Sequence, residues 1–136
     1  MTGPPLLCLN GPPGAGKTTV GTAVHDLLSA RKIPNTFVDF DALTRTWPKA
    51  EGAPFNWRLG LTNLASVWTN AHAAGSRRLI VATVIETDAD RADLATAVGA
   101  TTLAVVRLTA PVAAMRARLA GRETGTDLEW HQARAA

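Results

Sequence analysis

Short apolar runs alternate along the chain with segments in which apolar residues recur at helical spacing. The apolar runs occupy residues 4–10, 35–40, 78–85 and 101–109. Each run has the length and the aliphatic or β-branched content of a strand. The third, RLIVATVI, is continuous enough to be buried on both faces of a parallel sheet. The pattern therefore predicts four strands.

The segments between the strands have the three- and four-residue apolar spacing of amphipathic helices. The expected helices cover about 16–32, 56–74, 87–99 and the residues from Pro111 onward. The first carries its apolar stripe at Val20, Ala23, Val24, Leu27 and Leu28. The stripe of the second is Leu61, Leu64, Trp68 and Ala71. Thr87 or Asp88 caps the third, which ends at Gly99, and the last has its stripe at Val112, Met115 and Leu119.

Strands that alternate with helices of this length predict an α/β fold, a three-layer parallel sheet with helices on both faces. A chain of 136 residues is the size of a single domain, so we expect residues 1–136 to form one unit. With 46% hydrophobic and 18% charged residues, neither disorder nor a membrane span is indicated. The N-terminus lacks a signal-peptide pattern, and the single cysteine, Cys8, has no partner cysteine. We therefore expect a cytoplasmic protein.

The net charge of +3 comes mostly from arginine, and five arginines fall between Arg107 and Arg134. A basic balance can indicate a nucleic-acid partner. Only one aromatic residue, Trp130, lies among these arginines, however, and a pocket for phosphorylated ligands explains them as well. Nucleic-acid binding is therefore the least favoured of the functions considered.

The residues after the first strand match the phosphate-binding loop, with Gly11, four residues, and then Gly16, Lys17 and Thr18 before a helix. Glycines allow the backbone to bring several N–H groups toward one point, where the helix N-terminus adds its partial positive charge. Lys17 would reach the outer phosphates, and the Thr18 hydroxyl would bind a magnesium ion that bridges them. The alternative is a glycine-rich turn that only joins strand to helix. The expected nucleotide-binding residues are Gly11, Pro12, Pro13, Gly14, Ala15, Gly16, Lys17, Thr18 and Thr19.

Three segments together resemble the P-loop kinases that phosphorylate nucleotides and small molecules, such as shikimate, gluconate, adenylyl-sulfate and chloramphenicol kinases. The segments are LNGPPGAGKTTV, FVDFDALT and VVRLTAPVAAMRARLAGRE, in that order along most of the chain. The first segment is a specific phosphate-loop motif, and the other two support the resemblance through their order and spacing. The resemblance implies a P-loop fold, ATP as phosphoryl donor, Mg2+ as cofactor and a small-molecule hydroxyl as acceptor.

Asp39 and Asp41 leave the second strand at its carboxyl end, the side of an open parallel sheet on which ligands bind. In the resembled kinases an acidic residue here holds the acceptor hydroxyl or the magnesium shell. We expect Asp41 to align the acceptor and Asp39 to contact the acceptor or the metal. The alternative is that Asp41 only caps the helix that begins at Ala42, while Asp39 points outward.

Two further residues are candidates for the acceptor side. Arg58 resembles the arginine with which many of these kinases grip an anionic acceptor, although it could equally be a solvated residue. Glu86 closes the third strand beside the phosphate loop, where an acid could order a magnesium-bound water. Its alternative role is to begin the next turn.

Arg118 and Arg122 lie four residues apart, on one face of the expected last helix. In the resembled family, arginines after the fourth strand begin a mobile lid that closes over the transferring phosphate. We expect the two residues to take part in catalysis in this way. A basic solvated face is the alternative.

The resembled kinases have a fifth strand and a last helix after the lid, which the sequence up to Ala136 does not show. The fold is therefore expected to lack them, which makes the fourth strand a sheet edge unless an unusual segment or another chain, as in a homodimer, covers it. This shortfall leaves two functions open. One is an ATP-dependent small-molecule kinase, and the other is a noncatalytic nucleotide-binding module.

Overall fold

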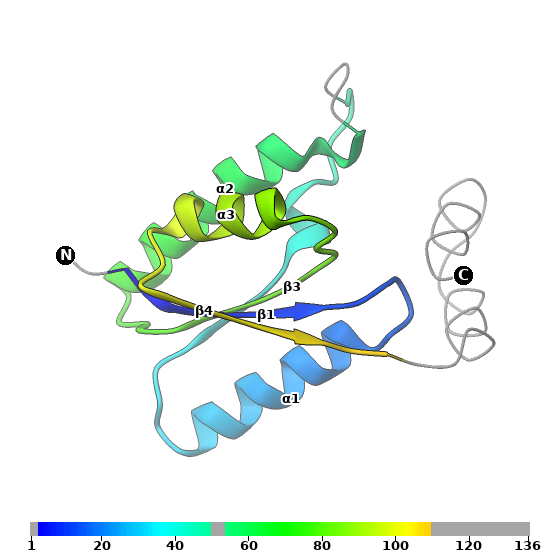
Figure 1. Ribbon diagram of the computed structural model, residues 1–136. Coiled ribbons are helices and arrows are strands. Elements are labelled where there is room, and N and C mark those ends of the chain that lie inside the picture. Colours follow the sequence, from blue (N-terminus) through cyan, green and yellow to red (C-terminus); the bar gives the residue numbers. More distant parts are fainter. Residues whose placement is uncertain (1–2, 50–53, 110–136) are drawn as a thin grey trace.

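The computed structural model describes residues 3–49 and 54–109 (Figure 1). Its strands are β1 (Pro5–Asn10), β2 (Thr36–Asp39), β3 (Leu79–Thr83) and β4 (Thr102–Arg107). The α-helices are α1 (Lys17–Ala30), α2 (Trp57–Ala73) and α3 (Asp88–Val98), and two short 3-10 segments are η1 (Phe40–Leu43) and η2 (Pro54–Asn56). The four predicted strands and the first three predicted helices are confirmed. The helix expected from Pro111 lies outside the described residues.

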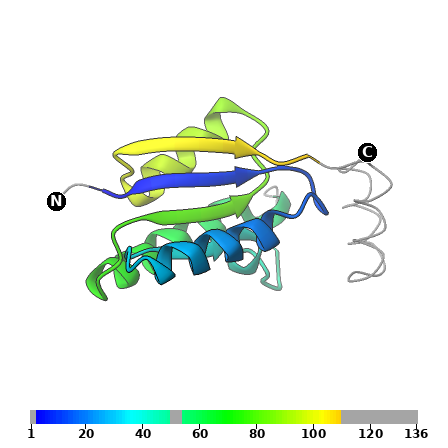
Figure 2. The same cartoon turned by 90° about the horizontal axis from the view of Figure 1, so that it is seen from below.

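The strands form one parallel sheet in the order β2-β3-β1-β4. The central strand β1 pairs on both sides, so that Cys8 lies opposite Val81 of β3 and Val105 of β4. Because all four strands run the same way, their carboxyl ends meet at one edge of the sheet (Figures 1 and 2). Helices cover both faces, with α2 and α3 on one and α1 on the other (Figure 1). The predicted three-layer α/β fold is confirmed.

The main core lies between the sheet and the two helices α2 and α3. Leu64 of α2 and Leu94 of α3 are completely buried there, together with Val81 and Cys8 of the sheet. The stripe predicted for α2 is confirmed, since its four residues all lie in or against this core. At the start of α3, Thr87 rather than Asp88 is the cap, and it forms a capping box with Asp90.

The opposite face has a thinner core under α1. Val20, Val24 and Leu28 pack there against the sheet, whereas Ala23 and Leu27, which the sequence pattern placed on the same stripe, are exposed, Leu27 to 54%. In Figure 2, α1 lies alongside β3, whereas β1 and β4 lie on the far side of β3 from this helix. A helix centred over β3 and β2 buries only a narrow stripe, and Leu27 lies at its flank. The expectations for Ala23 and Leu27 are therefore wrong.

Strand β4 is an edge of the sheet among the described strands, as the sequence predicted. Leu103 and Val105 pack against the main core, but Val106 is 45% exposed. Arg107 ends the strand and is exposed.

Within residues 3–49 and 54–109, no helix is long and apolar enough to cross a membrane.

Burial of Cys8 has a consequence that can be measured. Desolvation in the core, partly opposed by the charge of Arg91, raises the pKa of the Cys8 thiol from 9.0 to about 12. The folded protein therefore keeps its thiol proton at a pH at which the unfolded chain loses it, and the stabilising effect fades as pH rises from 9 toward 12. We expect the free energy of unfolding to fall by up to about 1.4 kcal/mol per pH unit above pH 9. Denaturant titrations at several pH values should show that the free energy of unfolding falls less steeply with pH in Cys8→Ala than in wild type. Equal slopes in the two proteins would contradict the raised pKa of Cys8.

Candidate phosphate-binding site

The loop between β1 and α1 has a backbone that only glycine adopts readily at two positions. Gly14 has φ 85° and Gly16 has φ 95°, both in the left-handed region. Gly16 is the N-cap of α1 and has no side chain with which to cap the helix. No side chain of the N-cap residue therefore caps the first turn of α1, and N–H groups at such a helix start can donate to an anion.

Gly11, the first glycine of the motif, is required for a close approach rather than for an unusual φ. A Cβ atom at this position would lie 2.7 Å from the carbonyl oxygen of Leu108 and 3.2 Å from the Cβ of Ala15. The loop therefore begins tightly packed against the end of β4. Any larger residue would push the loop away from the sheet.

Lys17 and Thr18 lie at the start of α1, where the motif predicts them. The Lys17 ammonium donates to the carbonyl oxygens of Gly11 at 2.7 Å and Pro12 at 3.1 Å, so the side chain bends back over the loop. The Thr18 hydroxyl donates to Oδ2 of Asp39 at 3.1 Å. A hydroxyl and a carboxylate thus lie side by side at the phosphate loop, and both are oxygen ligands that suit Mg2+.

The two aspartates after β2 have different positions. Asp39 is the N-cap of η1, because its Oδ1 accepts the Asp41 N–H at 3.2 Å while its Oδ2 accepts from Thr18. Asp41 lies in the first turn of η1 with an exposed side chain. The alternative that Asp41 caps a helix beginning at Ala42 is therefore wrong, since a 3-10 turn begins two residues earlier, at Phe40, and Asp39 is its cap.

The segment that carries Asp41 is held firmly against the start of α2. Two buried or half-buried amides, Asn56 and Asn63, donate to the carbonyl oxygens of Thr44 at 2.9 Å and Leu43 at 2.8 Å. These bonds satisfy carbonyl groups at the end of η1. The Phe40 ring also packs against Trp57 in a tilted arrangement, with ring centroids 4.9 Å apart and the ring planes 49° apart.

Arg58 lies on α2 and is directed toward α3. Its side chain is 77% exposed, and its Nη2 is 3.7 Å from Oδ2 of Asp93. The same carboxylate oxygen accepts a hydrogen bond of 2.9 Å from the Trp57 indole. An ion pair this exposed contributes little to stability. It does hold the guanidinium near Asp93 instead of at the aspartates after β2.

Glu86 follows β3 at the carboxyl edge and is exposed. Its N–H donates to Oδ2 of Asp90 at 2.9 Å, within the capping box of α3. Immediately before it, Ile85 exchanges two hydrogen bonds with the side chain of Asn10. Glu86 is therefore held from both sides beside the start of the phosphate loop.

The structure brings together one group of the predicted residues, namely the loop 11–16, Lys17, Thr18 and Asp39. Asp41 on η1 and Glu86 after β3 lie next to this group, whereas Arg58 is directed toward Asp93 on α3. Arg118 and Arg122 lie outside the described residues. Among residues 3–49 and 54–109, no three His, Cys, Asp or Glu side chains gather as a metal site. Magnesium at a site of this kind takes most of its ligands from phosphates and water.

Sequence reasoning missed the amides and the carboxylate that hold this site in place: Asn10, Asn56, Asn63 and Asp93. Three of them contact backbone atoms rather than other side chains, so no motif spacing marks them. The only signal in the sequence was that Asn10 is a polar residue ending an otherwise apolar run.

The fold is similar to that of several solved small-molecule kinases. An APS kinase from Mycobacterium tuberculosis, solved in complex with AMPPNP and APS, matches with a TM-score of 0.64 at 19% identity, over 91% of this chain and 78% of the kinase. A gluconokinase from Sinorhizobium meliloti 1021 matches with a TM-score of 0.60 at 19% identity, over 99% and 76%. A sugar kinase from Janibacter sp. HTCC2649 has a TM-score of 0.58 at 20% identity, over 98% and 78%. No protein-family model and no curated protein sequence matches the chain.

Proposed function

We propose that the protein is an ATP-dependent kinase that transfers the γ-phosphoryl group to a hydroxyl of a small molecule. The observation that carries the proposal is the contact between Thr18 and Asp39, which places a metal-binding hydroxyl and a carboxylate beside Lys17 at the phosphate loop. A turn that served only to connect β1 with α1 would need neither side chain. The similarity in fold to solved kinases also supports the proposed kinase function.

Each residue has a distinct task in this proposal. The loop amides and Lys17 hold the donor phosphates, and Lys17 exchanges its two loop carbonyls for phosphate oxygens. Thr18 and Asp39 hold Mg2+, directly or through water. When bound, Mg2+ neutralises charge on the phosphates. The magnesium assignment is a proposal from the side chains present.

Asp41 is proposed to align the acceptor. It is exposed two residues after Asp39 and lies on a segment fixed by Asn56 and Asn63. The acceptor oxygen forms a bond to the γ-phosphorus as the bond to the β–γ bridging oxygen breaks, which releases ADP. The hydroxyl proton passes to the Asp41 carboxylate or to water. Arg118 and Arg122 remain predicted to cover the transferring phosphate.

The alternative is a noncatalytic nucleotide-binding module. The observation that favours it concerns Arg58, which pairs with Asp93 on α3 and leaves the acceptor side without the expected cation at that position. Both functions include nucleotide binding, so turnover must separate them.

Phosphoryl transfer by Asp41→Asn tests the kinase directly. Candidate acceptors are small hydroxyl compounds that raise the melting temperature of the protein. With ATP, Mg2+ and such a compound, the wild-type chain should produce ADP and a phosphorylated product. We expect Asp41→Asn to reduce turnover by about 100-fold or more while ATP affinity stays within about twofold. Asp26→Asn, which removes an exposed acid on α1, is the matched control and should behave as wild type. Nucleotide binding without any turnover would instead establish the binding module.

A further inference from the structure

The side chain of Asn10 joins the start of the phosphate loop to the segment after β3 through two hydrogen bonds. Its Nδ2 donates to the carbonyl oxygen of Ile85 at 3.1 Å, and its Oδ1 accepts from the Ile85 N–H at 2.8 Å. Both backbone groups of Ile85 are thus bound by one amide. A side-chain amide that donates to and accepts from the same residue replaces the backbone hydrogen bonds that a further strand residue would make.

This side chain continues the pairing of two strands after their backbones have separated. The ladder between β1 and β3 ends with Asn10 opposite Thr83. Beyond that pair, the backbone of β1 turns into the phosphate loop, and the Asn10 amide reaches two residues further, to Ile85. The Asn10 backbone carbonyl accepts from the Leu108 N–H at 2.6 Å on the other side. One residue therefore joins the ends of β1, β3 and β4 where the loop begins.

The residue placed by this connection is Glu86. Ile85 packs against the main core, and Glu86 is the next residue toward solvent. Asp90 holds the Glu86 N–H from the other side. With its neighbours bound at both ends, the Glu86 backbone has a fixed position relative to Gly11.

From this geometry we infer that Asn10 is a positioning residue, which fixes Glu86 beside the start of the phosphate loop, where its carboxylate would hold a water of the magnesium shell. The inference rests on the proposed function and extends it to a residue outside the motif. Asn10 itself does not contact nucleotide or metal. It acts through Glu86, and residues that orient a metal shell typically change metal affinity by about 10- to 100-fold when removed.

The Mg2+-dependent gain in ATP affinity is the quantity that the test measures. Calorimetric titrations with ATP in Mg2+ and in EDTA give this gain for each variant. In Asn10→Leu we expect the gain to fall about tenfold, while affinity in EDTA stays within about twofold because the Lys17 and loop contacts are retained. Glu86→Gln should lose a similar part of the gain, and the double variant should be no worse than Glu86→Gln alone. Asn10→Ser, which is shorter and cannot bridge Ile85, serves if the leucine variant does not fold.

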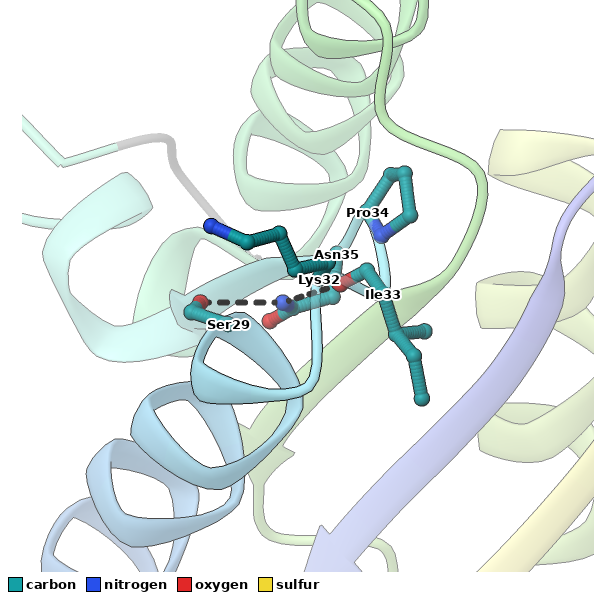
Figure 3. Close-up of a pocket in the computed structure, with 5 residues that line it drawn as sticks. All are labelled: Ser29, Lys32, Ile33, Pro34 and Asn35. Atoms are coloured by element: carbon teal, nitrogen blue, oxygen red, sulfur yellow. Dashed lines mark hydrogen bonds between the residues drawn. The ribbon is translucent and has the colours of Figure 1, made fainter.

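Asn35→Leu is the matched control, because Asn35 is also an amide bound to backbone and side-chain atoms. It lies at the other end of α1, where it donates to Ser29 and to the carbonyl oxygen of Ile33 beside a hollow of about 330 Å³ (Figure 3). This variant should lower the melting temperature and leave the Mg2+-dependent gain unchanged.

The outcomes separate the inference from the function on which it rests. Wild-type protein that binds no ATP in either buffer would overturn the proposed function. Wild-type binding with a normal gain in Asn10→Leu or Asn10→Ser would overturn the inference alone. Effects of Asn10→Leu and Glu86→Gln that simply multiply would also overturn it, since they would show that Asn10 does not act through Glu86.

Discussion

Lys17→Ala is expected to lose ATP affinity by about 100-fold, which corresponds to about 2.7 kcal/mol. The ammonium lies over the loop, within 2.7 Å of the Gly11 carbonyl and 3.1 Å of the Pro12 carbonyl. A phosphate chain held by the loop amides would therefore lie within its reach. Its removal leaves phosphate charge without its nearest cation. Thermal shift with increasing ATP and Mg2+ should show a saturable rise for wild type and almost none for the variant.

The control for Lys17→Ala must remove the same charge elsewhere. Lys32 is exposed at the far end of α1, beside Asn35 (Figure 3). Lys32→Ala should therefore keep the affinity of wild type. Equal losses in the two variants would mean that net charge, rather than the position of Lys17, governs binding.

Leu64→Ala is expected to have the largest effect on stability. Leu64 is 0% exposed in the main core between α2, α3 and the sheet. Truncation of such a side chain removes buried apolar surface and leaves a cavity, at a cost of about 3 kcal/mol. For a domain of this size that should lower the melting temperature by roughly 10 °C. Calorimetry or circular dichroism would measure the change.

Leu27→Ala is the matched control on the other face of the sheet. Leu27 is 54% exposed on α1, so the same truncation should shift the free energy of unfolding by less than about 0.5 kcal/mol. A loss as large as that of Leu64→Ala would show that another surface covers Leu27 in solution.

The fold was largely predictable from the sequence because apolar spacing is decided locally. Continuous apolar runs separated by helical stripes leave few arrangements other than a parallel sheet between helices. The stripe of α2 was predicted correctly, since its four residues point into one large core. Leu27 was not, because the position of α1 across the sheet decides which side of its stripe is covered, and spacing alone does not contain that position.

The candidate site was predictable only in part. The loop, Lys17 and Thr18 follow from a motif whose backbone requirements restrict the residue types. Asp39 was predicted near the loop from its place at the end of a strand. Asn10 was missed because its partner, Ile85, is 75 residues away and is bound through backbone atoms. Arg58 could not be placed, because Asp93, the residue that holds it, lies on another helix.

The most direct test of nucleotide binding is a calorimetric titration of the full chain with ATP in the presence of Mg2+. We expect saturable heat for one site per chain. Inorganic triphosphate should compete with ATP for this site, since the loop would hold the phosphate chain. No heat up to millimolar ATP, with no change in melting temperature at the same concentrations, would contradict nucleotide binding at this site.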